Sequence, residues 1–415
     1  MAVGQSAAQD LGLRFTVVRA RTEELAAPLS PEDQTIQSMP DVSPTKWHRA
    51  HTTWFFEAFL LGPAGDHQPY DPTFAYLFNS YYEGMGERHP RPQRGLLSRP
   101  SVAEVGRYRA ATDDAVHRLL ADGVDAHQAA LVELGLNHEQ QHQELLLMDI
   151  KHVFGVNPLR PAYLARPDDA VAARPQRWLE HDGGLVEVGH DGDGFAYDNE
   201  QPRHPVHLAP FALADRPVTA GEWLAFMADG GYQRADLWLS DGWATVQASG
   251  WRAPLYWEDA GDGWSVHTLH GVRPIDPERP VTHVSHYEAD AFARWAGARL
   301  PTEHEWEAVV ADCAGTWPAG ADRDELEPTM PDARSNPLAL GEVWEWTGSA
   351  YQPYPGFRPA PGAVGEYNGK FMVNQQVLRG GCAATPNGHG RATYRNFFPS
   401  ASRWAFSGVR LAHDQ

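Results

Sequence analysis

Apolar residues recur every three or four positions through the first ~155 residues, the spacing that places side chains on one face of a helix. Ser43 and Pro44 are assigned as the N-cap and the first residue of the second helix, and Gly62-Pro63 as its end. The pattern predicts four helices, near residues 7–29, 44–61, 102–123 and 126–154. Four helices joined by loops favour a helical bundle.

The pattern changes after Trp178, where short apolar segments alternate with Gly, Asp and Pro turns. Two predicted helices, at 220–228 and 287–296, interrupt these segments, which favours an α+β domain with irregular loops. Residues 156–177 contain four prolines and little periodicity, and we interpret them as an inter-domain linker. We therefore predict two domains, 1–160 for the bundle and 178–415 for the α+β domain.

Composition narrows the classes of function. The formal net charge of −20 disfavours nucleic acid and anionic membranes as partners. No apolar run approaches the ~18 residues that span a bilayer, and the N-terminus lacks the pattern of a signal peptide. We therefore expect a cytoplasmic protein. Two cysteines, Cys313 and Cys382, cannot form a disulfide framework or a thiolate metal cage.

The most specific local pattern is NHEQQHQELLLMD at residues 137–149. His138 and His142 are four positions apart, so they share a helix face and their imidazoles can converge on one metal ion. The same stripe contains Leu145 and Met148 and should face the bundle core. Two imidazoles buried there without a shared partner would be costly. The pattern therefore indicates a metal site.

The third ligand must come from another helix. Asp149 lies ~16 Å along the helix axis from His138, too far to share one ion. His51 is the best candidate, because it belongs to the apolar stripe of the second helix, whereas the rival His48 lies off that stripe. Three neutral imidazoles suit Fe(II) or Zn(II) and leave positions open for substrate. The ligand type alone does not separate these two metals.

Residues 76–99 combine aromatic and basic side chains in an acidic protein. Arginine binds carboxylates through paired hydrogen bonds, and a tyrosine near an open metal position can donate a proton or an electron. A solvated basic loop with anchoring aromatic residues explains the composition equally well, so both interpretations stay open. The residues concerned are Tyr81, Tyr82, Arg88, Arg91, Arg94 and Arg99.

The C-terminal region offers a second aromatic group. Trp344 and Trp346 are two positions apart and share one face of a strand. With Tyr394 and the amide of Asn396 they can line a pocket, and aromatic faces attract quaternary ammonium groups. Core packing is the other interpretation, and we favour it for most of these residues.

Taken together, the strings WHRAHTTWFFE, NHEQQHQEL, RLPTEHEWE, GEVWEWT, LRGG, YRNFFP and SGVRLA resemble, in order, the ergothioneine-type sulfoxide synthases. That family joins an all-α, DinB-like four-helix bundle to an α+β domain similar to formylglycine-generating enzyme, with a C-type-lectin-like fold. The resemblance covers nearly the whole chain. It implies that the bundle carries the metal ligands and that the second domain completes the substrate pocket.

The resemblance also implies an activity. It implies an Fe(II) cofactor held by His51, His138 and His142. It implies hercynine, O2 and either cysteine or γ-glutamylcysteine as small-molecule substrates, with hercynylcysteine sulfoxide as the product formed in ergothioneine biosynthesis. The FNSYYEG string resembles the branch that uses free cysteine. In another branch a Trp-Asp pair follows the Asn, where Phe397 and Phe398 stand here.

Individual positions match residues with a role in the family. Tyr81 and Tyr82 match catalytic positions on the oxygen side of the site. The substrate-binding positions fall on Gln141 and Asn396 for hercynine, and on Arg91 and Arg94 for the carboxylate of the thiol substrate.

Several alternatives remain. HEQQH fits the H-E-x-x-H pattern of zinc peptidases, but Leu145 and Met148 stand where the extended metzincin form has Gly and His. A copper-dependent formylglycine-generating oxidase needs a close cysteine pair, whereas Cys382 has no such neighbour. An ovothiol-type synthase acts on histidine, and its architecture adds a methyltransferase domain. Outside this class are a zinc-dependent DinB-like thiol transferase and a non-catalytic metal-binding scaffold.

Overall fold

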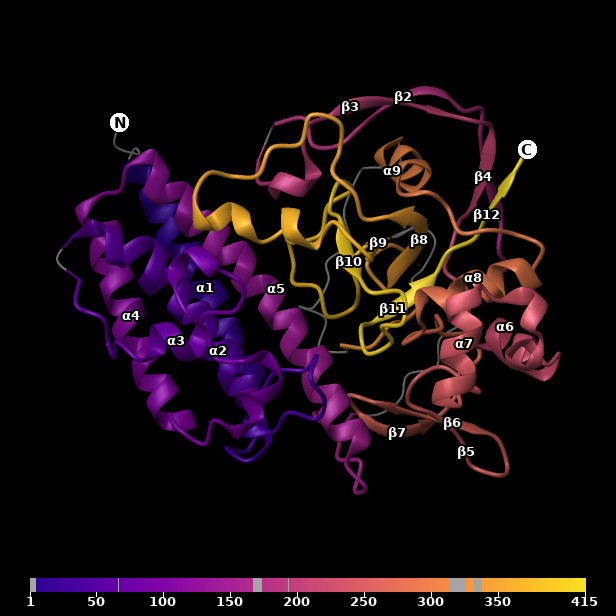
Figure 1. Cartoon of the computed structure of the whole chain (residues 1–415), viewed down its shortest axis with the longest axis horizontal. Helices are drawn as coiled ribbons and strands as arrows, with labels where there is room; N and C mark the ends of the chain where they lie inside the picture. The colour runs from indigo at the N-terminus through magenta and orange to yellow at the C-terminus, as the bar shows by residue number, and fades with distance from the viewer. Residues whose placement is uncertain (1–4, 66, 167–173, 193, 313–325, 331–337) are drawn as a thin grey trace. The chain divides into compact units, whose positions relative to one another are not determined.

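The computed structural model describes residues 5–65, 67–166, 174–192, 194–312, 326–330 and 338–415. Cys313 and residues 167–173 of the predicted linker lie outside these ranges. The chain divides into two compact units (Figure 1). One unit contains residues 1–164 and 361–366, and the other contains 165–360 and 367–415.

Four long helices form the first unit. They are α1 (Gln5–Ala26), α2 (Thr45–Phe55), α4 (Val102–Asp122) and α5 (Ala126–Val156). Helices α1 and α2 each pack against both α4 and α5, and Figure 1 shows the four side by side in indigo to magenta. The predicted helical bundle is confirmed.

Large apolar side chains fill the centre of the bundle. Phe15, Phe56 and Val116 are fully buried in one cluster, and Trp54 and Tyr108 are buried in a second. The N-terminus of α5 is closed by a capping box between Asp125 and Gln128, which satisfies two otherwise unpaired backbone N–H groups. Helix α2 differs from a surface helix because all eleven of its residues are buried.

The predicted capping of α2 by Ser43 is wrong. The helix begins at Thr45, and Pro44 occupies the N-cap position without a side-chain hydrogen bond. The Ser43 hydroxyl instead accepts from Arg94 at 2.9 Å, and the Ser43 backbone N–H donates to Asp149 at 2.7 Å. Both partners are distant in sequence, so no local pattern signals these bonds.

In its described residues, the long connection between α2 and α4 contains short helical segments. Helix α2 continues into a π-helical turn, η2 (Phe56–Leu61), and α3 (Phe74–Phe78) follows. The others are 3-10 turns, η3 (Gly62–Ala64), η4 (Glu83–Met85) and η5 (Arg91–Leu96); η1 (Asp33–Thr35) precedes α2.

A segment from late in the chain belongs to the first unit. It includes η9 (Ala363–Glu366), which packs against η4. The Glu366 carboxylate accepts the backbone N–H groups of Glu83 at 2.9 Å and Gly84 at 2.8 Å. The loop that carries Tyr81 and Tyr82 is thereby held by residues more than 280 positions away. The predicted domain boundaries did not assign residues 361–366 to the first unit.

The described part of the second unit contains four small sheets. Their orders are β1-β4-β12, β10-β9-β8-β11, β2-β3 and β5-β6-β7, antiparallel except for the parallel pair β8 and β11. The strands are β1 (Trp178–His181), β2 (Gly184–Val188), β3 (His204–Leu208), β4 (Phe211–Ala214), β5 (Trp257–Asp259), β6 (Trp264–Thr268), β7 (Gly271–Pro274), β8 (Trp344–Ala350), β9 (Gln376–Arg379), β10 (Asn396–Phe398), β11 (Ser407–Val409) and β12 (Ala412–Asp414).

Helices and short turns connect these strands. The helices are α6 (Ala220–Ala228), α7 (Ser240–Ser249), α8 (His286–Trp295) and α9 (Glu303–Asp312), with 3-10 turns η6 (Asp198–Glu200), η7 (Gly231–Gln233), η8 (Ala235–Leu237) and η10 (Gly369–Phe371). Helix α6 has the predicted bounds, and α8 begins and ends one residue before them. The sequence pattern did not predict α7 or α9. The predicted α+β fold is confirmed.

The core of the second unit combines indoles with buried ion pairs. Trp344 and Trp346 on β8 are 1% and 0% exposed, so they are core residues. Arg379 and Arg395 both donate to the carboxylate of Glu303, and all three side chains are buried. Although burial opposes ionisation, Arg395 and Arg379 hold the pKa of Glu303 at about 2. The cluster therefore ties α9 to β9 and to the segment before β10.

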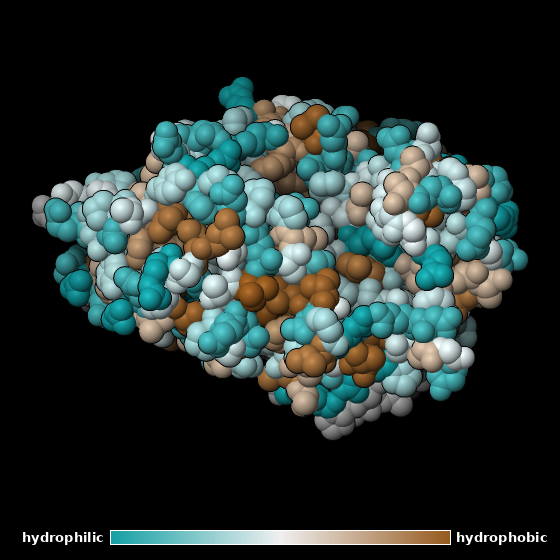
Figure 2. Space-filling model, turned by 60° about the horizontal axis from the view of Figure 1, so that its bottom comes forward, coloured by the Kyte–Doolittle hydropathy of each residue, from teal (hydrophilic) through white to brown (hydrophobic). Residues whose placement is uncertain are grey.

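The surface is mixed in hydropathy. Hydrophilic residues predominate on the face drawn in Figure 2, and hydrophobic residues gather there in small groups. None of the helices in the described ranges combines the length and the apolar character needed to cross a bilayer.

Candidate metal centre

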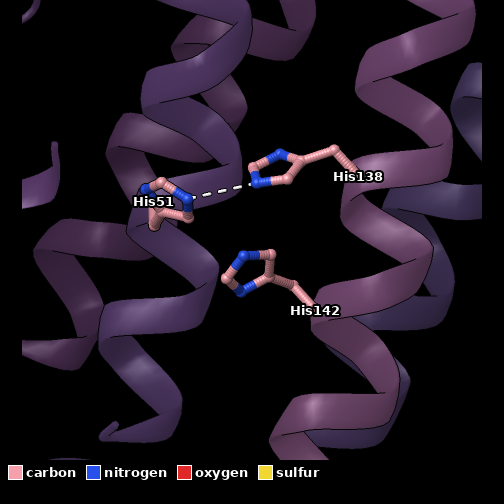
Figure 3. Close-up of side chains that lie close together, drawn as sticks. All are labelled: His51, His138 and His142. Carbon is pink, nitrogen blue, oxygen red and sulfur yellow. Dashed lines mark hydrogen bonds between the residues drawn. The ribbon is translucent and has the colours of Figure 1, made fainter. Parts of the chain in front are cut away.

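Three histidines from two helices face one another inside the bundle (Figure 3). Helix α2 provides His51, and α5 provides His138 and His142. One ring nitrogen from each lies within 4.8 Å of the other two. The closest pair is His51 Nε2 and His138 Nε2, at 3.2 Å. The structure thus brings together the three residues that the sequence analysis selected as ligands.

The orientation of His51 is fixed by its neighbours. Its Nδ1 lies 2.6 Å from the carbonyl oxygen of Phe78, at the end of α3. The carbonyl can only accept, so Nδ1 carries the proton, and the lone pair of Nε2 is directed toward the other two histidines. Trp47 stacks on the His51 ring with centroids 4.6 Å apart. Metal-binding histidines are commonly held by such a second hydrogen bond.

The three imidazoles are neutral at physiological pH. Burial is the main cause, and it lowers the pKa of His138 to about 4. Burial also lowers the pKa of His51 and of His142 well below the ordinary value, and repulsion from the neighbouring imidazoles adds to the shift. Neutral imidazoles keep the lone pair that a metal ion requires.

An ion network occupies another face of α5, one residue from His138. Glu139 is fully buried and accepts from Arg19 at 2.8 Å, Arg109 at 2.8 Å and Thr22 at 2.7 Å. Burial raises the pKa of Glu139, but the two guanidiniums outweigh it and hold the pKa at about 2. Glu139 is therefore an anion whose charge is matched by its own partners.

Two residues that were set aside as ligands lie next to the histidine group, where His48 contacts His142 and Asp149 contacts His48. His48 Nδ1 lies 2.8 Å from His142 Nδ1, and His48 Nε2 lies 3.0 Å from Asp149 Oδ2. Neither His48 nor Asp149 belongs to the group of converging nitrogens. Sequence reasoning weighed both only as metal ligands and missed these contacts. The signal available was the seven-residue spacing of His142 and Asp149, which repeats one face of a helix.

The predicted tyrosine and arginine residues form one connected loop. Tyr82 is buried against Trp54, with ring centroids 5.8 Å apart, and Trp54 lies beside His51. The Tyr81 hydroxyl accepts from Arg91, which also donates to the Asp41 carbonyl. The loop begins at Phe78, whose backbone carbonyl accepts a hydrogen bond from His51. This bond connects the loop to the histidine group.

Arg94 is the most enclosed cation of this loop. It is 3% exposed, donates to the hydroxyls of Ser43 and Ser80, and lies 3.4 Å above the Trp47 ring. Burial lowers the pKa of the guanidinium to about 9. Arg94 therefore already has protein partners for two of its nitrogens, whereas Arg91 is less buried.

Asn79 organises the same loop and was missed by sequence reasoning. Its amide nitrogen donates to the carbonyls of Tyr82 at 2.9 Å and Gly86 at 3.2 Å, and its oxygen accepts the Tyr82 N–H. The side chain is fully buried. An Asn-Ser pair before two tyrosines was the signal, because Asn side chains often bond nearby backbone groups in turns.

The two predicted hercynine-binding residues belong to different units. Gln141 precedes His142 on α5 and is partly buried. Asn396 begins β10 in the second unit, and its side-chain oxygen accepts the Phe397 N–H at 2.9 Å. Their role toward a substrate stays a prediction.

Comparison with known proteins defines the class. Residues 14–146 match the DinB superfamily, and residues 169–339 and 338–415 match the sulfatase-modifying factor enzyme 1-like domain. The protein thus combines a DinB-type helical bundle, with three clustered histidines, and a domain of the formylglycine-generating type.

Full-length relatives identify the family. The chain is 34% identical to "Hercynine oxygenase" of Mycolicibacterium thermoresistibile over 90% of this chain and 88% of that protein. It is also 34% identical to "Hercynine oxygenase" of Mycobacterium tuberculosis, over 98% and 99%. "Formylglycine-generating enzyme" of Streptomyces coelicolor is 36% identical over 35% of this chain and 51% of that protein. The chain belongs to the hercynine oxygenase family and is an oxidoreductase. The predicted family is confirmed.

Proposed function

We propose that this enzyme uses Fe(II) and O2 to join the sulfur of cysteine to the imidazole of hercynine, giving hercynylcysteine sulfoxide for ergothioneine biosynthesis. The names of its full-length relatives support hercynine as substrate. "Ergothioneine biosynthesis protein 1" of Schizosaccharomyces pombe, 27% identical over 52% of this chain, supports the pathway. The observation that carries the proposal is the group of three neutral imidazoles on α2 and α5.

The donor set fits Fe(II). His51, His138 and His142 would hold the ion through three neutral nitrogens, which leaves coordination positions for substrates. A bound Fe(II) would supply a site for the thiolate and for O2, and would carry electrons between them. No carboxylate belongs to the group, so the ion would keep its positive charge and favour a thiolate partner.

One O2 balances the proposed reaction without an added reductant. The thiol loses its S–H proton and the imidazole loses its C2–H proton as the carbon–sulfur bond forms, which removes two electrons. Oxidation of the sulfur to the sulfoxide removes two more. O2 accepts these four electrons, and one oxygen atom enters the sulfoxide while the other leaves as water.

The chain's own side chains would bind the substrates and move a proton. Tyr81, whose hydroxyl oxygen accepts from Arg91, would donate its own proton on the oxygen side. Tyr82 would line that side as a buried ring. Arg91 and Arg94 would bind the carboxylate of cysteine, and Gln141 and Asn396 would hold hercynine.

A product assay tests this function. The protein is loaded with Fe(II) without oxygen, mixed with hercynine and cysteine, exposed to O2 and analysed by mass spectrometry, with γ-glutamylcysteine in a parallel reaction. We expect the mass of hercynylcysteine sulfoxide in the cysteine reaction. Product only in the parallel reaction would overturn the choice of thiol. No coupled product in either reaction, from protein shown to contain iron, would refute the proposed function.

A further inference from the structure

His48 and Asp149 form a chain of hydrogen bonds that ends on one of the three histidines. Asp149 lies on α5 seven residues after His142, and His48 lies on α2 three residues before His51. Asp149 Oδ2 is 3.0 Å from His48 Nε2, and His48 Nδ1 is 2.8 Å from His142 Nδ1. His48 and Asp149 are each 3% exposed.

The chain of bonds dictates where each proton sits. A carboxylate only accepts hydrogen bonds, so the His48 Nε2 carries a proton and donates it to Asp149. The neutral form of His48 has a single N–H, which Nε2 carries, and its Nδ1 is then an acceptor. The His142 Nδ1 therefore donates to it, and the lone pair of His142 lies on Nε2, the nitrogen left for the group with His51 and His138.

The three histidines differ in how they are held. His51 is oriented by the backbone carbonyl of Phe78, whereas His138 Nδ1 has no hydrogen-bond partner among the described residues. Of the three histidines, His142 alone is connected to a carboxylate by hydrogen-bonded side chains within the part of the chain that the structure describes. A carboxylate acting through the second ring nitrogen fixes the tautomer of a metal-binding histidine and increases its basicity.

We infer that His48 and Asp149 are positioning residues that hold His142 in the tautomer and orientation that bind the metal ion. The inference rests on the proposed function, because it assumes that His142 is a ligand. Neither residue touches the substrate or the ion. Asp149 was too far along α5 to be a ligand itself, and it acts on the centre through His48.

Substitutions of Asp149 can remove its charge with or without its hydrogen bonds. One oxygen, Oδ2, accepts both from His48 and from the Ser43 backbone N–H at 2.7 Å, and Oδ1 has no partner among the described residues. The amide oxygen of an Asp149→Asn variant can accept both bonds, so this variant keeps the tautomer and loses the charge. An Asp149→Leu variant loses both. His48→Phe removes the connecting imidazole and leaves the Ser43 bond intact.

The test measures binding of Co(II), whose d–d absorption reports ligand geometry, to the full-length protein without substrates. We expect Co(II) affinity to fall about 10–100-fold in His48→Phe and in Asp149→Leu, with an altered absorption spectrum, and to fall less in Asp149→Asn. The matched control is His127→Phe near the start of the same helix, where the ring is exposed. This control should bind Co(II) as the wild type does.

The outcomes distinguish failure of the positioning role from failure of the metal centre. Wild-type affinity and an unchanged spectrum in His48→Phe, or in Asp149→Leu, would overturn the positioning role while leaving the proposed function intact. Failure of the wild-type protein to bind Co(II) or Fe(II) would refute the metal centre itself, and the inference with it. Unfolding of each apoprotein, followed in parallel, identifies a variant that has lost its fold, and the other variant then decides.

Discussion

Helix α5 carries two polar clusters of opposite character, one residue apart; the first is buried and the second is partly buried. At Glu139, a carboxylate meets two guanidiniums and a hydroxyl, and every charge has an opposite charge within hydrogen-bond distance. At His138 and His142, ring nitrogens converge with that of His51 and no carboxylate joins the group. Both clusters remove polar groups from water. In the first cluster, protein partners of opposite charge offset the cost of this desolvation, whereas the histidine cluster contains no such partner.

This difference in charge pairing indicates that the Glu139 cluster is structural and that the histidine cluster is functional. The Glu139 network joins α1, α4 and α5 through partners that are all protein, so it stabilises the bundle as it stands. The histidine group directs three ring nitrogens toward one point, with the nitrogens of His51 and His138 at a hydrogen-bond distance of 3.2 Å, and a cation between the three would bind a lone pair from each. The predictions below test this contrast, from the largest expected effect to the smallest.

The largest loss of stability is expected from Glu139→Ala. It leaves Arg19 and Arg109 buried without their shared anion, which typically costs about 3–5 kcal/mol. The free energy of unfolding in urea measures the loss. Glu133→Ala, on the same helix, is the matched control, because its pair with Arg14 is solvent-accessible and should contribute at most about 1 kcal/mol. Equal effects of the two substitutions would contradict the structural role of Glu139.

Metal should stabilise the protein only through the histidine group. Fe(II) at 100 times its Kd, added without oxygen, should increase the free energy of unfolding of the wild type by about 2.7 kcal/mol. A chelator should reverse the effect. His142→Ala should show no such increase, whereas Glu133→Ala should retain it. Stabilisation of His142→Ala by Fe(II) to the wild-type extent would place the metal elsewhere.

The two clusters should respond to acid in different windows. The pKa of His138 falls from the ordinary 6.5 to about 4 in the folded protein, chiefly through burial, so unfolded chains bind protons first as the pH decreases. The metal-free protein should therefore lose about 1–3 kcal/mol as the pH falls from 6.5 towards 4. Glu139 changes only between 4.5 and about 2, where protonation removes its stabilising charge.

The contribution of His138 is measured by the free energy of unfolding in urea. Metal-free wild type and His138→Gln are compared at about pH 7 and about pH 5. The loss of stability between these two conditions should be smaller in the variant. An equal loss in both proteins would mean that His138 does not contribute to the acid sensitivity.

The smallest effect is expected where Glu366 holds the loop of Tyr81 and Tyr82. Glu366→Gln keeps one of two oxygens that accept the Glu83 and Gly84 N–H groups, and should cost about 1 kcal/mol locally. Amide hydrogen exchange at residues 83–85 should accelerate, with Glu87→Gln as the control on the same loop. Unchanged exchange in Glu366→Gln would show that the late segment does not restrain the loop.

Sequence periodicity was sufficient for elements whose signal is local. The bounds of α4, α5 and α6 agree with prediction within about two residues, because each helix has a capping residue or a glycine at an end. The spacing of His138 and His142 likewise predicted two members of the histidine group. Helix α9 was missed because buried glutamates, Glu303 and Glu307, interrupt its buried apolar residues and find their partner in the distant Arg379.

The remaining features depend on contacts between distant residues. His48 was set aside as a ligand because it lies off the apolar stripe of α2. However, α2 is buried on every side, so a position off that stripe is not exposed to solvent. Glu366 returns to the bundle from the far part of the chain, and Ser43 bonds Asp149 rather than capping α2. No pattern within one segment encodes these partners.

The most direct test of the account compares O2 consumption by the Fe(II)-loaded and Zn(II)-loaded protein in the presence of hercynine and cysteine. We predict that the iron form consumes one O2 for each sulfoxide formed, that it consumes little without either substrate, and that the zinc form consumes none. Coupled product from the zinc form, or no O2 consumption by the iron form with both substrates present, would contradict an iron-dependent sulfoxide synthase and favour a zinc thiol transferase or a metal-binding scaffold.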